Sequence, residues 1–133
     1  MKKSSEWHPI QGALFKAIVR FFSWFSLPMQ HRFGAAIGWL LWRLPNSARR
    51  ITEKNLAIAF PNLSESERSV LAKTSLIETG KTATELGAIW CWPQTKKLKL
   101  IQRVEGADKL AQAVSLGKGV MVLSPHVGCW EII

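Results

Sequence analysis

The sequence predicts an α/β protein in which membrane-associating helices precede the beginning of an α/β domain. Three observations carry this prediction. Residues 9–44 are largely apolar with helical periodicity, the pattern becomes strand-like after Pro93, and a short apolar run at 120–123 follows a glycine-rich turn. We place the membrane-associating helical region at residues 1–46 and the N-terminal portion of the α/β domain at residues 47–133.

Positive charge and aromatic residues are concentrated in the first part of this 133-residue chain. The net charge is +9, and residues 1–60 hold nine Lys and Arg against two acids. Four of the seven Trp also lie there, at positions 7, 24, 39 and 42. Cations interleaved with Trp and Phe are typical of a bilayer interface, where headgroups attract cations and indole rings lie at the boundary. Nucleic-acid binders more often group their cations on a polar face, so we expect a membrane surface and no nucleic acid.

The first apolar segment, residues 10–26, has the pattern of an amphipathic helix. Lys16, Arg20 and Ser23 share one narrow stripe, and apolar side chains cover most of the remaining surface. Such a helix can lie in the headgroup plane while its cations extend to phosphates. A tilted membrane span is one alternative. A core helix of a larger soluble protein is another.

Three more helices are expected before residue 93. The first covers residues 29–43, where Gly34 and Gly38 are spaced for close helix packing. The second covers residues 49–60 and ends at a proline, which lacks a backbone donor. A third, long helix should begin after Ser64, because the sequence Ser-Glu-Ser-Glu at 64–67 is a capping box.

A βαβ unit is expected after Pro93. Residues 98–104 alternate as a strand does, residues 107–116 fit a short helix that ends at Gly117, and residues 120–123 form a continuously apolar second strand. Strand, helix and strand in this order are typical of α/β domains. Ligands of such domains bind at the carboxyl ends of the strands, which is where His126 follows.

His126 and Glu131 form an H-x4-E pair, and they are the candidate catalytic residues of the chain. Histidine is well suited to moving protons near neutral pH. A carboxylate that holds one ring nitrogen fixes the tautomer and leaves the other nitrogen free as a base. Gly128 permits a tight turn or a close approach of substrate. A purely structural histidine is the alternative, since this spacing alone is common.

The other polar and sulfur-containing candidates do not predict a binding site or a disulfide. Arg49, Arg50 and Asn55 would either hold a phosphate or form a solvated helix face, and the solvated face is favoured. Cys91 and Cys129 are expected to be free thiols, because two cysteines in apolar surroundings do not form a disulfide framework. The spacing supports neither a metal site nor a cofactor site.

Four features together resemble one protein family. They are the Trp-rich N-terminal region, RITEKNL at 50–56 running into Phe-Pro at 60–61, GKGV at 117–120, and HVGCWE at 126–131. In this order they resemble the bacterial lipid A biosynthesis acyltransferases, the late lauroyl and myristoyl transferases. The H-x4-[DE] motif is shared with the wider glycerolipid acyltransferases, so the resemblance implies a glycerolipid-acyltransferase-like α/β domain.

The resemblance also implies an activity, partners and a location. The protein would act at the cytoplasmic face of the bacterial inner membrane and move a fatty acyl chain from acyl carrier protein to a hydroxyl of a lipid A precursor. His126 would be the general base and Glu131 the acid that orients it, with no cofactor or metal. The domain would be incomplete, truncated at the catalytic motif, so we expect an inactive fragment. The alternative is a non-catalytic membrane-surface or interaction protein derived from such an enzyme.

Overall fold

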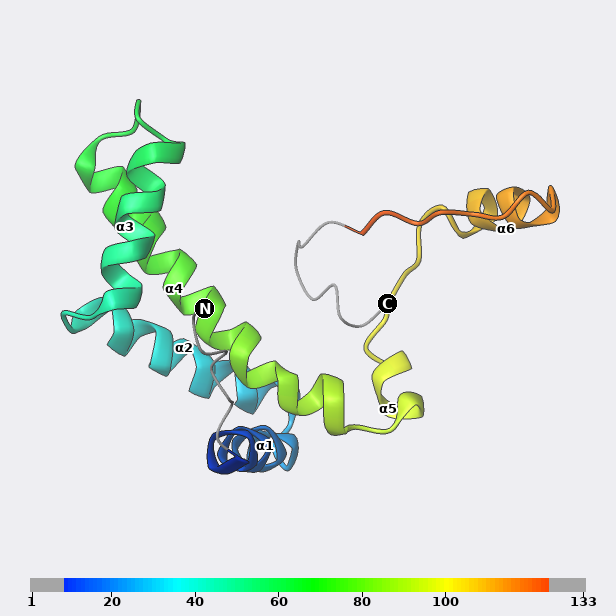
Figure 1. Ribbon diagram of the computed structural model, residues 1–133, viewed down its shortest axis with the longest axis horizontal. Helices are drawn as coiled ribbons and strands as arrows, with labels where there is room; N and C mark the ends of the chain where they lie inside the picture. The colour runs from blue at the N-terminus through cyan, green and yellow to red at the C-terminus, as the bar shows by residue number, and fades with distance from the viewer. Residues whose placement is uncertain (1–8, 125–133) are drawn as a thin grey trace, which may run out of the picture. The chain divides into compact units, whose positions relative to one another are not determined.

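The computed structural model describes residues 9–124, and within that range the secondary structure is helical (Figure 1). The chain divides into two compact units, Met1–Cys91 and Trp92–Ile133. The first unit contains α1 (Pro9–Ser23), α2 (Leu27–Arg43), α3 (Ser47–Ala59) and α4 (Glu65–Cys91), and the second contains α5 (Gln94–Leu98) and α6 (Ala107–Ser115).

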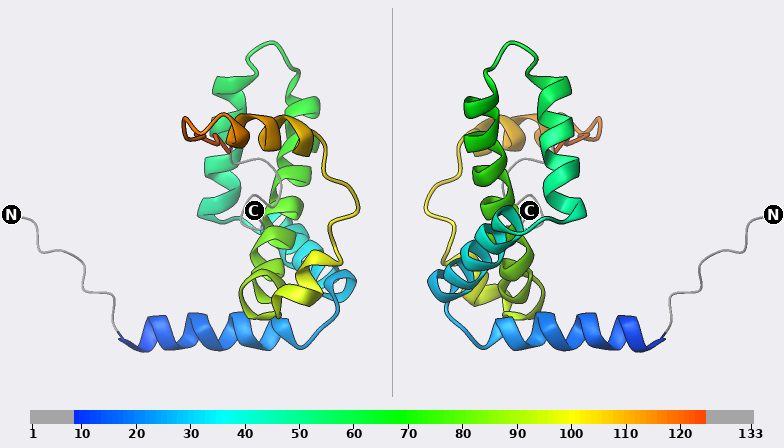
Figure 2. Two further views of the ribbon diagram at one scale, coloured as in Figure 1. Left: turned by 90° about the vertical axis from the view of Figure 1, so that its right-hand side faces the viewer. Right: turned by 90° about the vertical axis from the view of Figure 1, so that its left-hand side faces the viewer.

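Helix α4 is the central element of the first unit, because α1, α2 and α3 all pack against it. Helix α3 runs beside the first part of α4, and α1 crosses α4 near its carboxyl end (Figure 2). The core along α4 consists mainly of small and medium-sized side chains, and its buried apolar residues in this unit are Val19, Ala72, Leu76, Ala88 and Ile89.

The crossing of α2 and α4 is so close that a β-carbon does not fit at three of its glycines. A β-carbon on Gly34 would collide with the backbone of Gly80, and one on Gly80 would collide with the backbone of Gly34. A β-carbon on Gly38 would meet the backbone of Leu76 and Ile77. The expected close packing at Gly34 and Gly38 is therefore confirmed. Helix α4 continues unbroken through Gly80, where the two backbones approach each other.

The capping box at the start of α4 is formed as the sequence predicts. The backbone N–H of Ser64 donates to Glu67 Oε2 at 2.8 Å, and the backbone N–H of Glu67 donates to Ser64 Oγ at 3.3 Å. The Ser64 hydroxyl also donates to the same carboxylate at 2.6 Å. The two backbone bonds thus satisfy N–H groups that a helix start would otherwise leave to solvent.

This capping box should make the stability of the first unit depend on pH. The donors of Ser64 hold the pKa of Glu67 below its ordinary value, because they stabilise the carboxylate of the folded state. A carboxyl group whose pKa is lower in the folded than in the unfolded state stabilises the fold at pH values above the unfolded-state pKa. This stabilisation is lost as the pH falls through the folded-state pKa. We expect Ser64→Ala to lower the Tm more at neutral pH than at about pH 3, as measured by circular dichroism. An equal loss at both pH values would contradict this.

The two predicted strands are wrong for the described residues. Helix α5 reaches Leu98, and hydrogen bonds from Leu100 N to Lys97 O (2.9 Å) and from Ile101 N to Leu98 O (3.2 Å) continue as turns. Residues 120–123 are irregular as well. A strand is stable only when a neighbour pairs its backbone groups, and the described residues supply no such neighbour. The helical part of the prediction is confirmed there, whereas the α/β class is not.

Candidate functional site

The candidate catalytic residues His126 and Glu131 lie outside the described residues, as does Gly128. Their roles therefore stay predictions. The described structure reaches residue 124 and shows how the chain approaches the motif.

That approach is a short helix followed by a glycine turn. Helix α6 ends as expected before Gly117, whose N–H donates to Val114 O at 3.1 Å. Gly117 and Gly119 have φ angles of 65° and 78°, in the left-handed region that favours glycine. The segment GKG at 117–119 is thus a helix end and a turn, as predicted. It leads into residues 120–123, whose apolar side chains are all exposed.

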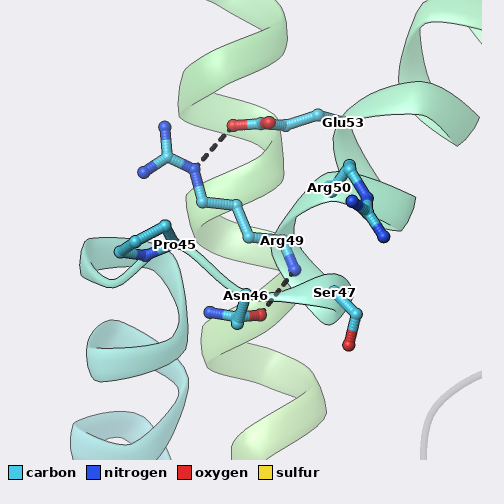
Figure 3. Close-up of a pocket in the computed structure, with 6 residues that line it drawn as sticks. All are labelled: Pro45, Asn46, Ser47, Arg49, Arg50 and Glu53. Carbon is cyan, nitrogen blue, oxygen red and sulfur yellow. Dashed lines mark hydrogen bonds and ion pairs between the residues drawn. The ribbon is translucent and has the colours of Figure 1, made fainter.

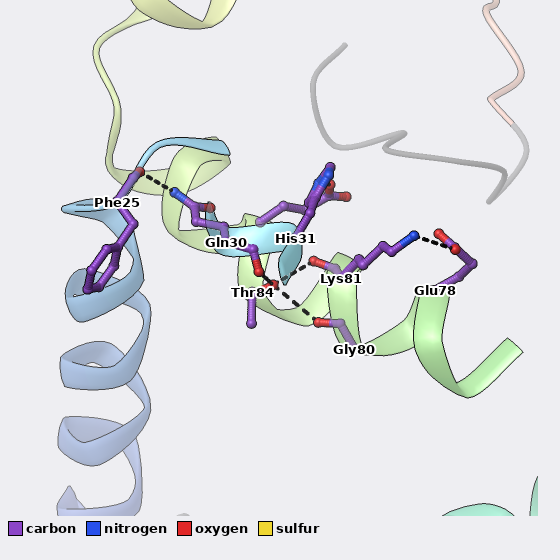
Figure 4. Close-up of polar contacts among 8 residues, drawn as sticks. Phe25, Gln30, His31, Glu78, Gly80, Lys81 and Thr84 are labelled. Carbon is purple, nitrogen blue, oxygen red and sulfur yellow. Dashed lines mark hydrogen bonds and ion pairs between the residues drawn. The ribbon is translucent and has the colours of Figure 1, made fainter. Parts of the chain in front are cut away.

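The described residues contain a different histidine–carboxylate pair, which was not predicted from the sequence. His31 Nε2 on α2 lies 2.8 Å from Glu85 Oε2 on α4. Nearby, Thr84 Oγ1 donates to Gln30 O at 2.8 Å, and Gln30 Nε2 donates to Phe25 O at 3.0 Å (Figure 4). The His31–Glu85 and Thr84–Gln30 contacts link α2 to α4, and the bond from Gln30 ties α2 to the turn that follows α1. We assign all three a structural role. His31 and Glu85 are 54 positions apart, as are Gln30 and Thr84, and no local spacing signals these contacts.

A surface pocket lies at the junction of α2 and α3 (Figure 3). Asn46 caps α3, accepting from the backbone N–H of Arg49 at 2.9 Å and donating to Leu44 O at 2.7 Å. Arg49 Nε donates to Glu53 Oε1 at 2.8 Å, and its Nη1 donates to Trp42 O at 2.9 Å. Helix α3 begins at Ser47, two residues before the predicted start at residue 49, and its cap was not predicted although Asn is a preferred capping residue.

These contacts favour the solvated face over the phosphate alternative. The guanidinium of Arg49 is already occupied by Glu53 and a backbone carbonyl. Arg50 is exposed and points away from the Arg49–Glu53 pair (Figure 3). Asn55 is exposed too, and five helical positions from Arg50 place it on another face of α3.

Helix α1 presents an exposed apolar face. Val19 is buried on the side toward α4, and Phe15 contacts the Trp90 ring with centroids 5.9 Å apart. The other side of the helix is open, and exposed Lys16 and Arg20 lie beside it. The large exposed apolar residues of this open side are Ile10, Leu14, Ile18 and Phe21. None of the helices within residues 9–124 has both the length and the apolar character to cross a membrane.

Helix α2 exposes apolar side chains as well. Phe33 contacts Phe22 in the last turn of α1 and Phe25 in the turn that follows, with ring centroids 6.2 Å and 5.3 Å apart. Ile37 and Leu40 follow Phe33 at four and seven positions, so the three share one side of the helix. All three are between 40% and 49% exposed. We call these three residues, with Ile10, Leu14, Ile18 and Phe21, the apolar surface.

Comparison with known proteins gives one consistent family. The model of the family described as bacterial lipid A biosynthesis acyltransferase matches residues 2–133. A lipid A biosynthesis palmitoleoyltransferase of Escherichia coli (strain K12) is 31% identical over 99 residues, which are 74% of this chain and 32% of that protein.

Two further relatives cover the same shares of both chains. They are a lipid A biosynthesis acyltransferase of Haemophilus influenzae, 30% identical over 101 residues, and a lipid A biosynthesis lauroyltransferase of Escherichia coli (strain K12), 25% identical over 99 residues. The chain thus matches about a third of the length of these relatives. No solved structure matches it significantly.

Proposed function

The chain belongs to the bacterial lipid A biosynthesis acyltransferase family, and on this premise we propose that it serves in the transfer of a fatty acyl chain to a lipid A precursor. The observation that carries the proposal is the match over residues 2–133, which includes the HVGCWE segment.

The proposed chemistry is direct attack of a hydroxyl on a thioester. His126 takes the proton from the acceptor hydroxyl, and Glu131 holds the imidazole in the required tautomer. The acceptor oxygen forms a bond to the thioester carbonyl, and the carbon–sulfur bond breaks. The sulfur leaves as a thiol after it receives the proton from the imidazolium. An acyl-enzyme is not needed, because the acceptor itself is the nucleophile.

Acyl carrier protein is the proposed donor and a phosphorylated glycolipid the proposed acceptor. The net charge of +9 supports both assignments, since a basic protein attracts acidic proteins and phosphate groups.

We place the enzyme at the cytoplasmic face of the bacterial inner membrane, with residues 1–46 as its membrane-associating region. The apolar surface, flanked by Lys16 and Arg20, supports this placement, because cations beside exposed aromatic residues suit the bilayer interface.

Residues 47–133 are the proposed N-terminal portion of an α/β domain. The apolar run at 120–123 supports this, because 41% to 87% of each side chain is exposed. Such a run requires a partner, and pairing with further strands of a longer protein would bury it.

A specific observation also favours the second candidate, a non-catalytic membrane-surface protein. The apolar surface, with exposed Lys16 and Arg20 beside it, suits attachment to a bilayer interface, and such attachment needs no catalytic residue. One experiment separates the two candidates. Vesicle binding and acyl transfer from acyl carrier protein are measured for the 133-residue chain and for an enzyme of the relatives' length that contains it. We expect both proteins to bind vesicles and the longer one to transfer. Vesicle binding by both, with no transfer by either, would favour the non-catalytic candidate.

A further inference from the structure

Helix α5 and the residue after it carry a compact group of cations. Lys96, Lys97 and Lys99 lie in a stretch, residues 94–103, that contains no acidic residue. Lys96 and Lys99 are exposed and three positions apart in helical backbone, so they share one side of the turn. We call these three residues the lysine patch.

One lysine of the patch is held in place by an aromatic ring. The ammonium of Lys96 lies 3.3 Å from the ring centroid of Trp92, which is buried. A cation in this position is attracted by the negative face of the indole. The patch is therefore partly ordered before any partner arrives, which reduces the conformational entropy that binding would cost.

We propose that the lysine patch is the docking surface for an acidic protein, and that this partner is the acyl carrier protein that delivers the acyl chain. The identity of the partner rests on the proposed function. The patch belongs to the unit Trp92–Ile133, whose sequence also contains the proposed base His126. Donor docking and acyl transfer would then involve the same unit.

The surroundings of the patch favour a protein over a membrane. Residues 93–124 contain no Phe, Tyr or Trp. Within the described residues, all the exposed large aromatic side chains belong to the other unit, which carries the apolar surface. Bilayer interfaces favour cations accompanied by exposed aromatic rings. Complementary charge without such rings is better suited to the carboxylates of an acidic protein.

The residues around the patch also favour an acidic protein over a nucleic acid as its partner. The nearby Arg103 lies 3.2 Å from Glu105 in an ion pair. Single-stranded nucleic acids also need aromatic platforms for their bases, and residues 93–124 offer none.

The test compares two double substitutions that change the charge equally. Lys97→Glu with Lys99→Glu alters the patch and leaves Lys96 on its ring, while Lys16→Glu with Arg20→Glu alters the cations of α1. Each 133-residue chain is titrated with acyl carrier protein bearing its phosphopantetheine arm, and separately with vesicles containing phosphatidylglycerol. Circular dichroism confirms that the variants keep the helical content of the original chain.

We expect the patch variant to bind the carrier protein about tenfold more weakly and with less dependence on salt, while its binding to vesicles is unchanged. The α1 variant should show the opposite result. Equal carrier binding by the original chain and the patch variant would overturn the docking surface and leave the donor assignment intact. Loss of vesicle binding alone in the patch variant would identify the patch as a membrane contact and overturn the proposal. Absence of carrier binding by the original chain would overturn the docking surface, and a transfer assay of the longer enzyme would then decide the donor assignment separately.

Discussion

Gly38→Ala and Gly80→Ala are each expected to destabilise the unit Met1–Cys91 by about 1–3 kcal/mol. Each substitution adds one methyl group at the crossing of α2 and α4, where the glycines face the backbone of the opposite helix. Backbone atoms within a helix cannot move aside as the end of a flexible side chain does. The two helices must therefore separate along their contact. Thermal and urea unfolding followed by circular dichroism measure the loss.

Gly12→Ala is the matched control. Gly12 is also a helical glycine, in α1, but a β-carbon there would have no neighbour within 4 Å. Alanine stabilises a helix relative to glycine by up to about 1 kcal/mol, so this variant should be as stable as the original chain or slightly more stable. If all three variants changed the Tm alike, the close crossing would not be what stabilises the unit.

The crossing also determines the polar contacts between the same helices. The His31–Glu85 pair and the Thr84–Gln30 hydrogen bond both join α2 to α4, at 2.8 Å each. These short bonds need the two backbones to lie as close as the glycines allow. Alanine at position 80 should therefore weaken the polar contacts together with the packing.

The helices of the first unit could be predicted because their signals are local. A capping box at Ser64, a proline at position 61 and the period of apolar residues each act within a few positions. The spacing of Gly34 and Gly38 likewise predicted a close contact. It did not identify Gly80 as the partner, because that contact joins residues distant in the sequence.

The strands and the polar contacts depend on such distant partners. The alternation at 98–104 is a valid strand pattern, but strand formation needs backbone partners that are absent among the described residues. The pair of His31 with Glu85 was missed for the same reason, since no spacing relates residues 54 positions apart. The candidate His126 and Glu131 could be recognised because they lie close together in the sequence.

His126→Ala is expected to lower the rate of acyl transfer by about a thousandfold in an enzyme of the relatives' length that contains this sequence. The acceptor hydroxyl would lose the base that removes its proton as it attacks the thioester. Association with vesicles should be unchanged, because the apolar surface lies on α1 and α2. Transfer is measured by mass spectrometry of the acylated lipid A precursor, at saturating concentrations of donor and acceptor.

The pair of His31 and Glu85 supplies the control for this experiment. It is also a histidine beside a carboxylate, at 2.8 Å, but it joins two helices of the first unit. His31→Ala should lower the Tm and leave the transfer rate unchanged at temperatures where the protein is folded, because the pair has a structural role.

Near-normal turnover by His126→Ala would overturn the assignment of the base. Equal loss of turnover in both variants at a temperature where both are folded would show that the assay does not distinguish a catalytic histidine from a structural one. A large loss in His126→Ala alone would assign the proton transfer to the H-x4-E motif.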